Sequence, residues 1–434
     1  MFDLGVLNGN VYLNGTFVRG NLYCKDGCVA AVTTEQLDCT KHVDAAGKWV
    51  LPGFIDPHVH FALTVGQHTS SDNFYSGSVA AALGGVTTFI DFIDPVRDIA
   101  GLHSAYEQRL KLAERSAVDY GLHCTIKGLA DDTAAFLLAT AALGMPTVKL
   151  FTTYSSSGRR TFDRDIAALL TCSKACGTRI VVHAENDDLL HEGPDIPIAD
   201  HEHARPALCE RTAVLNLCEL AKACDGSLYI VHASAGNTAR RVREQYGELL
   251  HRDIVLESCP QYFWFDSSVY DTKNGCFYTM TPPLREKQEQ GVLREEADAI
   301  DVLATDHCPF ERALKQRAFV NEIPMGVGGV QYAFCAMFTL LGESILPKYT
   351  ENPARIEGLF PRKGTLAPGA DADIVLFDPK KRWTVADAES IYNGMEMRGK
   401  VVSVFSHGQT VVENGRFVGR AGAGNYLQRK MTAI

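Results

Sequence analysis

Residues 54–60 read Phe54-Ile55-Asp56-Pro57-His58-Val59-His60, an apolar run that ends on two histidines. Side chains alternate along a strand, so His58 and His60 point to the same face, roughly 7 Å apart along the backbone. Imidazoles are common metal ligands. The pair therefore predicts a strand whose carboxyl end presents two metal-ligand side chains to one site.

Seven further runs in the middle of the chain have the same strand-like character. The eight predicted strands are centred on Ile55, Phe89, Cys124, Val148, Val181, Ile230, Val255 and Leu303. Segments with helical length lie between and after them, at 78–84, 103–116, 132–143, 163–176, 210–224, 236–250, 286–298 and 330–343. Eight strands alternating with helices predict an α/β fold, a distorted (β/α)8 TIM barrel. A doubly wound open sheet is the alternative, but its dinucleotide-binding glycine fingerprint is missing.

Both ends of the chain differ from the middle. Short apolar pieces alternate there with turn signals such as Asn14-Gly15, Asp26-Gly27 and Asn414-Gly415, a pattern typical of antiparallel strands. We therefore expect residues 1–50 and 360–434 to form one small β-sandwich domain, and residues 51–359 to form the barrel.

Three more predicted strands end on a side chain that can bind a metal: His183, His232 and Asp306. Barrel enzymes build their sites at the carboxyl ends of the strands, so these side chains are expected to converge with the first histidine pair. Lys149 lies within an apolar run, where an unpaired charge is costly. A lysine carbamylated by carbon dioxide would supply the anion that bridges two metal ions about 3.5 to 4 Å apart.

Composition excludes several classes of protein. With 434 residues, of which 46% are apolar and 22% charged, the chain is typical of globular proteins. Its net charge of −10 and the lack of a basic block argue against nucleic-acid binding. No apolar run is long enough for a membrane span, and no signal peptide is recognisable. Thirteen cysteines without zinc-finger spacing indicate reduced thiols and a cytoplasmic location.

The motifs together resemble one known family. They lie at 52–60, 148–151, 183–186, 230–232, 257–262 and 305–310, and they span nearly the whole chain in the expected order. In this set the chain is similar to the cyclic amidohydrolases of the dihydropyrimidinase and hydantoinase type. The resemblance implies a metal-dependent hydrolase that opens a cyclic amide.

The same resemblance implies a role for each candidate residue. His58, His60 and Asp306 would hold one divalent metal ion, His183 and His232 would hold a second, and carbamylated Lys149 would bridge the two, with zinc as the expected metal. A hydroxide between the ions would attack the ring, with Asp306 as the general base and acid.

Further residues match the family around this centre. Tyr154 corresponds to the tyrosine that stabilises the oxyanion, and Thr281 and Met325 stand in the segments that hold the ring of the substrate. The family has serine and asparagine at the last two positions. Glu185, Asn186 and His307 are interpreted as residues that orient the metal ligands.

The expected substrate is a neutral cyclic amide or ureide, namely a dihydropyrimidine or a hydantoin with or without a substituent at the fifth ring position. Residues 61–66 carry no charge, whereas dihydroorotases place an arginine there for a substrate carboxylate. Three alternatives stay open: an allantoinase, a non-catalytic scaffold related to dihydropyrimidinase, and a mononuclear deaminase. A homo-oligomer, either a dimer or a tetramer, is expected.

Overall fold

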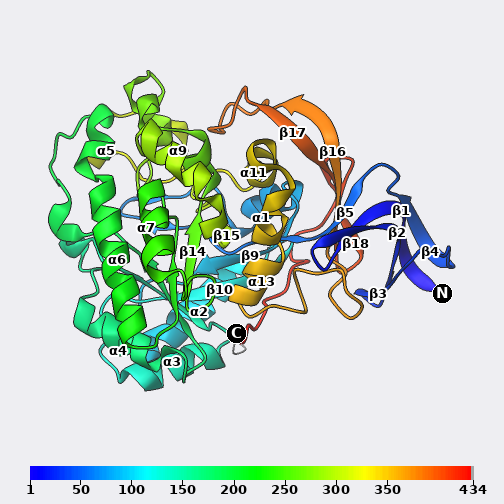
Figure 1. Cartoon of the computed structure of the whole chain (residues 1–434), viewed down its shortest axis with the longest axis horizontal. Helices are drawn as coiled ribbons and strands as arrows, with labels where there is room; N and C mark the ends of the chain where they lie inside the picture. Colours follow the sequence, from blue (N-terminus) through cyan, green and yellow to red (C-terminus); the bar gives the residue numbers. More distant parts are fainter. Residues whose placement is uncertain (432–434) are drawn as a thin grey trace.

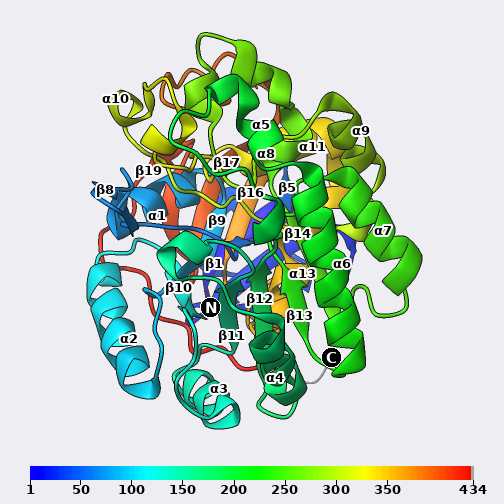
Figure 2. The ribbon, with the colours of Figure 1, turned by 90° about the vertical axis from the view of Figure 1, so that its left-hand side faces the viewer.

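Eight parallel strands form the centre of the computed structural model, which describes residues 1–431 (Figures 1 and 2). The strands are β6 (Phe54–Asp56), β9 (Val86–Phe92), β10 (Asp119–Thr125), β11 (Thr147–Phe151), β12 (Arg179–His183), β13 (Leu228–Ile230), β14 (Ile254–Ser258) and β15 (Val302–Leu303). They pair in chain order, and a parallel bridge between Val59 and His307 joins the first strand to the last. Each strand contains one of the eight predicted centres, so the barrel is confirmed.

Helices surround these strands, as Figure 2 shows for α2, α3, α4, α6 and α7. The helices are α1 (Phe74–Leu83), α2 (Ile99–Ala113), α3 (Thr133–Ala142), α4 (Asp163–Ser173), α5 (His201–Ala204), α6 (Ala207–Ala223), α7 (Gly236–Tyr246), α8 (Pro260–Trp264), α9 (Lys287–Glu295), α10 (Arg312–Lys315), α11 (Ala333–Leu341), α12 (Leu346–Tyr349) and α13 (Glu351–Ile356). The predicted helical segments overlap eight of them. The first begins earlier than predicted because Asn73 caps it, accepting from the amides of Tyr75 and Ser76.

The two ends of the chain form a second, mixed sheet, seen at the right of Figure 1. Its strands are β1 (Phe2–Leu13), β2 (Thr16–Lys25), β3 (Cys28–Thr33), β4 (Cys39–Asp44), β5 (Trp49–Pro52), β16 (Ile374–Thr384), β17 (Glu396–Ser406), β18 (Gln409–Glu413) and β19 (Arg416–Phe417). The antiparallel pair β5 and β16 joins the two ends into nine hydrogen-bonded strands. Apolar side chains of both ends share one core, which includes Val6, Val50 and Ile374. The expected small β domain built from both termini is therefore present.

The segment after β19 leaves this sheet and packs on the barrel. Tyr426 forms a parallel bridge with Tyr120 in β10. Arg429 is buried, and its guanidinium donates to Thr147 Oγ1 at 2.8 Å and forms an ion pair with Glu357. The barrel end opposite the predicted metal site is therefore closed in part by the tail of the chain.

Helices long and apolar enough to cross a bilayer are absent from the part of the chain that the structure describes.

Candidate metal centre

The six predicted metal ligands lie at the carboxyl ends of barrel strands, or within one of them. His58 and His60 follow β6, Lys149 lies in β11, His183 ends β12, His232 follows β13, and Asp306 follows β15. Parallel strands bring their carboxyl ends to one edge, so the fold gathers side chains that are up to 248 positions apart, from residue 58 to residue 306.

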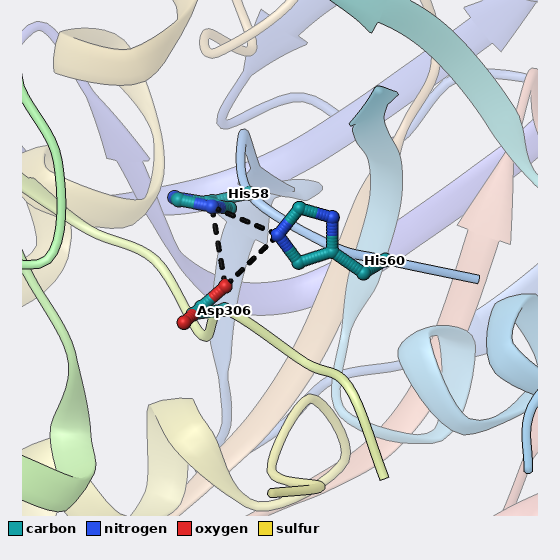
Figure 3. Close-up of side chains that lie close together, drawn as sticks. All are labelled: His58, His60 and Asp306. Atoms are coloured by element: carbon teal, nitrogen blue, oxygen red, sulfur yellow. Dashed lines mark hydrogen bonds and ion pairs between the residues drawn. The ribbon is translucent and has the colours of Figure 1, made fainter. Parts of the chain in front are cut away.

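The first group consists of His58, His60 and Asp306, whose side chains point toward one another in Figure 3. The two histidine Nε2 atoms are 3.2 Å apart. Oδ1 of Asp306 lies 3.2 Å from Nε2 of His58 and 3.1 Å from Nε2 of His60. Three potential ligand atoms thus surround one point.

The second group consists of His183 and His232, both buried. Nδ1 of His183 lies 3.0 Å from Nε2 of His232, while Nε2 of His183 contacts the carboxylate of Glu185 at 2.7 Å. A proton on the nitrogen that faces Glu185 leaves a lone pair on Nδ1, aimed at His232. Nδ1 of His183 and Nε2 of His232 can therefore bind one cation together.

Lys149 lies close to both groups. Its Nζ is 5.3 Å from the ring centre of Phe92, which is also 4.8 Å from the ring centres of both His58 and His60. On the side of the second group, its Nζ is 5.5 Å from the ring centre of Phe151, which is 5.7 Å from that of His183. The His58 and His232 ring centres are 5.5 Å apart, so the two groups adjoin. The structure therefore brings all six predicted ligands into one region.

Charges in the first group favour a cation. Burial alone would lower the pKa of His58, but the carboxylates of Glu257 and Asp306 outweigh it and raise the pKa to about 9. Burial would likewise raise the pKa of Asp306, yet His58 and His60 hold it well below its usual range. The carboxylates that favour a proton on His58 would equally stabilise a divalent cation beside it.

The amine of Lys149 is shifted toward its neutral form. Burial lowers its pKa to about 8, an effect that Asp306 and Glu257 partly oppose. Among residues 1–431, no side chain forms an ion pair or hydrogen bond with its Nζ. A neutral amine is the form that reacts with carbon dioxide, so the environment of Lys149 suits carbamylation.

Glu257, a fully buried carboxylate in β14, was not among the predicted site residues. Its Oε1 accepts from Nδ1 of His58 at 2.8 Å and from the backbone amide of His232 at 3.0 Å, and its Oε2 accepts from the hydroxyl of Tyr229 at 2.7 Å. One carboxylate thus orients a histidine of each group. In the sequence, the only indication of this role was a single glutamate at the end of the otherwise apolar run 254–257.

Of the three residues predicted to orient ligands, Glu185 contacts one directly. Its carboxylate holds His183, and Arg205 Nε donates to its Oε1 at 3.1 Å. Burial would raise the pKa of Glu185, but Arg205 and His183 hold it well below its usual range. His183 is therefore hydrogen-bonded to an ionised carboxylate.

The other two residues lie differently. Asn186 accepts from the amide of Asp188 at 3.1 Å and contacts Thr212, so it shapes the following turn and hydrogen-bonds to none of the six predicted ligands. His307 contacts Asp72 at 2.8 Å, and its backbone oxygen accepts from the amide of His60 at 2.9 Å. It thus reaches a predicted ligand only through its backbone.

Tyr154 and Thr281 face each other, with their hydroxyl oxygens 2.9 Å apart. The Tyr154 ring centre is 5.2 Å from that of His183, which places the phenol beside the second group.

Tyr154, His232 and Asp306 all have positive φ, of 68°, 42° and 51°. Such backbone is unfavourable for non-glycine residues and is concentrated at functional sites. Met325 is half-buried, in the loop before Gly326.

The donor set fits a pair of divalent metal ions. His58 donates from Nδ1 to Glu257, and His183 donates from Nε2 to Glu185, so the remaining nitrogen of each ring carries a lone pair. These nitrogens face other potential ligand atoms at 3.0 to 3.2 Å, close contacts that a shared cation would explain. Imidazole and carboxylate ligands suit zinc.

This barrel with its histidine and carboxylate rim has the architecture of an amidohydrolase. Residues 49–411 match the model of the Amidohydrolase family, and the chain belongs to that family.

Within this family, the chain is similar to hydantoinases and dihydropyrimidinases. The chain is 32% identical over 457 residues to a D-phenylhydantoinase from Escherichia coli O1:K1 / APEC, with 98% of each protein covered. The crystal structure of a dihydropyrimidinase from Brevibacillus agri NCHU1002 superposes with a TM-score of 0.92, at 31% identity and with 100% of both chains covered. An L-hydantoinase (dihydropyrimidinase) from Arthrobacter aurescens gives a TM-score of 0.88 at 25% identity, covering 99% of this chain and 100% of the other.

Proposed function

We propose that this protein hydrolyses the ring amide of a neutral cyclic amide or ureide, such as a hydantoin or a dihydropyrimidine. The observation that carries the proposal is the convergence of the two histidine groups, Asp306 and Lys149 on the rim of an amidohydrolase barrel. Relatives named for D-phenylhydantoin, hydantoin and dihydropyrimidine rings support this substrate class.

Two divalent metal ions, zinc in our proposal, would be held by His58, His60 and Asp306 on one side and by His183 and His232 on the other, with carbamylated Lys149 between them. When bound, such ions lower the pKa of water and polarise a carbonyl group. Replacing Lys149 by methionine should abolish the binuclear centre, which metal analysis would detect as a loss of bound zinc. A mononuclear deaminase would keep its metal and its activity in that variant.

The protein's own groups account for the remaining steps. Asp306 accepts a proton from the attacking water and passes it to the ring nitrogen as the carbon–nitrogen bond breaks. Tyr154 donates its hydroxyl proton in a hydrogen bond to the carbonyl oxygen, where negative charge develops. Thr281 and Met325, in the segments proposed to hold the ring, keep the scissile bond in place.

A neutral ring is favoured by the hairpin next to the first group. Strands β7 (Thr64–Val65) and β8 (His68–Thr69) form this hairpin, and Ser70 fixes it by donating to the backbone oxygen of His60 at 3.1 Å. Residues 61–66 in this element carry no charge. A substrate carboxylate would find no cation there.

The test is turnover of a substrate panel by zinc-loaded protein: hydantoin, both enantiomers of 5-phenylhydantoin, dihydrouracil, allantoin and dihydroorotate. Hydrolysis of hydantoins or dihydrouracil supports the proposal. Preferential hydrolysis of allantoin favours an allantoinase, and exclusive turnover of dihydroorotate contradicts a neutral substrate. Zinc binding in stoichiometric amount without turnover of any ring contradicts the proposed hydrolysis, and protein without metal favours a scaffold.

Three organisational proposals accompany this function. The proposed division keeps the barrel at 51–359 and the β domain at 1–50 and 360–434, except that residues 424–431 pack on the barrel. Residues 432–434 lie outside the described part of the chain. Unpaired cysteines at all thirteen positions support a reducing compartment such as the cytoplasm. A homodimer or homotetramer is proposed, and light scattering after size-exclusion chromatography would measure it.

A further inference from the structure

Lys315, at the end of α10, is buried without an acidic partner. Its side chain is 3% exposed, and its Nζ donates to the backbone oxygens of Thr279, at 2.7 Å, and of Gly326. Within residues 1–431, no carboxylate lies within ion-pair distance of this nitrogen. Burying an amine costs free energy unless its hydrogen bonds are made, so the two carbonyl contacts are what stabilise the lysine at this place.

The two carbonyls belong to different segments of the proposed substrate pocket. Thr279 lies two residues before Thr281, and Gly326 directly follows Met325. The amide of Gly326 also donates to the oxygen of Thr279, at 3.1 Å. Lys315 therefore completes a cross-link between the segments 279–282 and 325–327.

Each segment is also anchored to the barrel at its other contacts. The Tyr262 hydroxyl donates to the backbone oxygen of Pro282 at 2.8 Å, and the amide of Cys308 donates to the oxygen of Val327 at 2.9 Å. A Cβ at Gly326, where φ is +146°, would lie 2.3 Å from the Cys308 oxygen. The second segment therefore packs tightly beside the strand end that carries Asp306.

We propose that Lys315 is a positioning residue for the substrate: it fixes the separation of segments 279–282 and 325–327, and thereby the width of the pocket for the ring. This inference rests on the proposed ring-opening function. Burial lowers the pKa of Lys315 to about 7, and a neutral amine has two N–H donors, as many as the carbonyls it contacts. The side chain acts through the backbone and does not touch the reacting atoms.

The test compares Lys315→Met with the matched control Lys348→Met. Lys348 is also a buried lysine that donates to a backbone oxygen, that of Ile300, but it lies in α12, away from both segments. We expect Lys315→Met to raise KM for hydantoin at least about tenfold with a smaller change in kcat and no loss of bound zinc. Lys348→Met should change KM less than about twofold.

Ring size separates positioning from a general loss of stability. Hydantoin has a five-membered ring and dihydrouracil a six-membered ring, so a pocket of fixed width discriminates between them. Lys315→Met should change the ratio of their kcat/KM values at least about fivefold, whereas Lys348→Met should leave the ratio unchanged. Equal loss of activity toward both rings, or no loss, in Lys315→Met would overturn the proposal.

Hydrogen exchange gives a readout that does not depend on turnover. Amides in segments 279–282 and 325–327 should exchange faster in Lys315→Met than in the wild type, and at the wild-type rate in Lys348→Met. If the lysine variants do not fold, rapid exchange of the Gly326 amide in the wild-type protein would contradict the cross-link. If zinc-loaded wild-type protein opens no ring, the proposed function fails, and exchange alone decides whether Lys315 couples the segments.

Discussion

Replacing Glu257 by glutamine should weaken metal binding without changing the shape of the site. The carboxylate accepts three hydrogen bonds, from His58 Nδ1, the His232 amide and the Tyr229 hydroxyl, at 2.8, 3.0 and 2.7 Å. A glutamine oxygen can still accept from His58 and His232, while its amide group can donate to the Tyr229 oxygen. The variant therefore removes mainly the negative charge.

The magnitude follows from these contacts. Hydrogen bonds to a charged group contribute about 1.5–3 kcal/mol and neutral ones about 0.5–1.5 kcal/mol, so His58 loses about 1–1.5 kcal/mol of orienting interaction. Since 1.4 kcal/mol corresponds to about a tenfold change in a binding constant, we expect the zinc dissociation constant to rise about tenfold. Removal of groups that orient metal ligands costs about 10–100-fold in affinity, which agrees.

The assay is competition for zinc with a chromophoric chelator of known affinity. Glu357→Gln provides the matched control, because Glu357 is also fully buried but pairs with Arg429 at the opposite end of the barrel. The zinc affinity of the Glu357→Gln variant should differ from that of the wild type by less than about twofold. Equal zinc affinity in Glu257→Gln and the wild type would refute the reasoning that this carboxylate orients His58 for a metal.

Three further predictions concern other parts of the molecule. Tyr154→Phe should lower kcat about 10²–10³-fold with zinc content unchanged, because a donor to the developing oxyanion is lost; steady-state kinetics with hydantoin would measure this, and an unchanged kcat would contradict the role. His407 contacts Asp119 at 2.7 Å, and this hydrogen bond raises the pKa of His407 above its usual value. The stabilising contribution of protonated His407 is therefore fully present below about pH 6.5 and is lost as the pH rises through the folded-state pKa. Urea unfolding should show that His407→Gln is less stable than the wild type at pH 6, and that this difference in the free energy of unfolding shrinks by up to about 1 kcal/mol at pH 9. A gap that is larger at pH 9 would be inconsistent with this sign. Arg429→Met leaves the buried carboxylate of Glu357 without its partner and should lower the free energy of unfolding by about 3–5 kcal/mol, and a loss below 1 kcal/mol in urea unfolding would argue against this.

The positions of five of the six predicted ligands could be inferred because strand ends obey simple rules. Lys149 lies within β11, and its role was predicted from its charge in an apolar run and from the family resemblance. His58 and His60 share a face through the two-residue period of a strand, and parallel strands bring their carboxyl ends to one edge. The same rules apply to His183, His232 and Asp306. Local apolar runs were therefore enough to predict both the barrel and the region where the side chains meet.

Groups that act from within strands or loops were harder to assign. Glu257 lies inside β14, and its partners come from two other strand ends, so its role depends on tertiary packing. Asn186 is close in sequence to His183, yet its side chain turns to the local backbone at Asp188. Proximity along the chain did not predict which side chains touch.

Contacts between residues that lie far apart in the chain could not be predicted from the sequence. Arg429 reaches Thr147, 282 positions away, because the tail crosses from the β domain to the barrel. No local pattern marks this return. The predicted domain boundary at residue 360 stays a prediction, since residues beyond it contribute to both parts of the fold.

Anomalous diffraction from crystals of zinc-loaded protein tests the binuclear centre most directly. The account predicts two zinc peaks, one contacted by His58, His60 and Asp306 and the other by His183 and His232, with density for a carboxylated Nζ of Lys149 joining them. A single peak, or an unmodified Lys149 directed away from the ions, would contradict it.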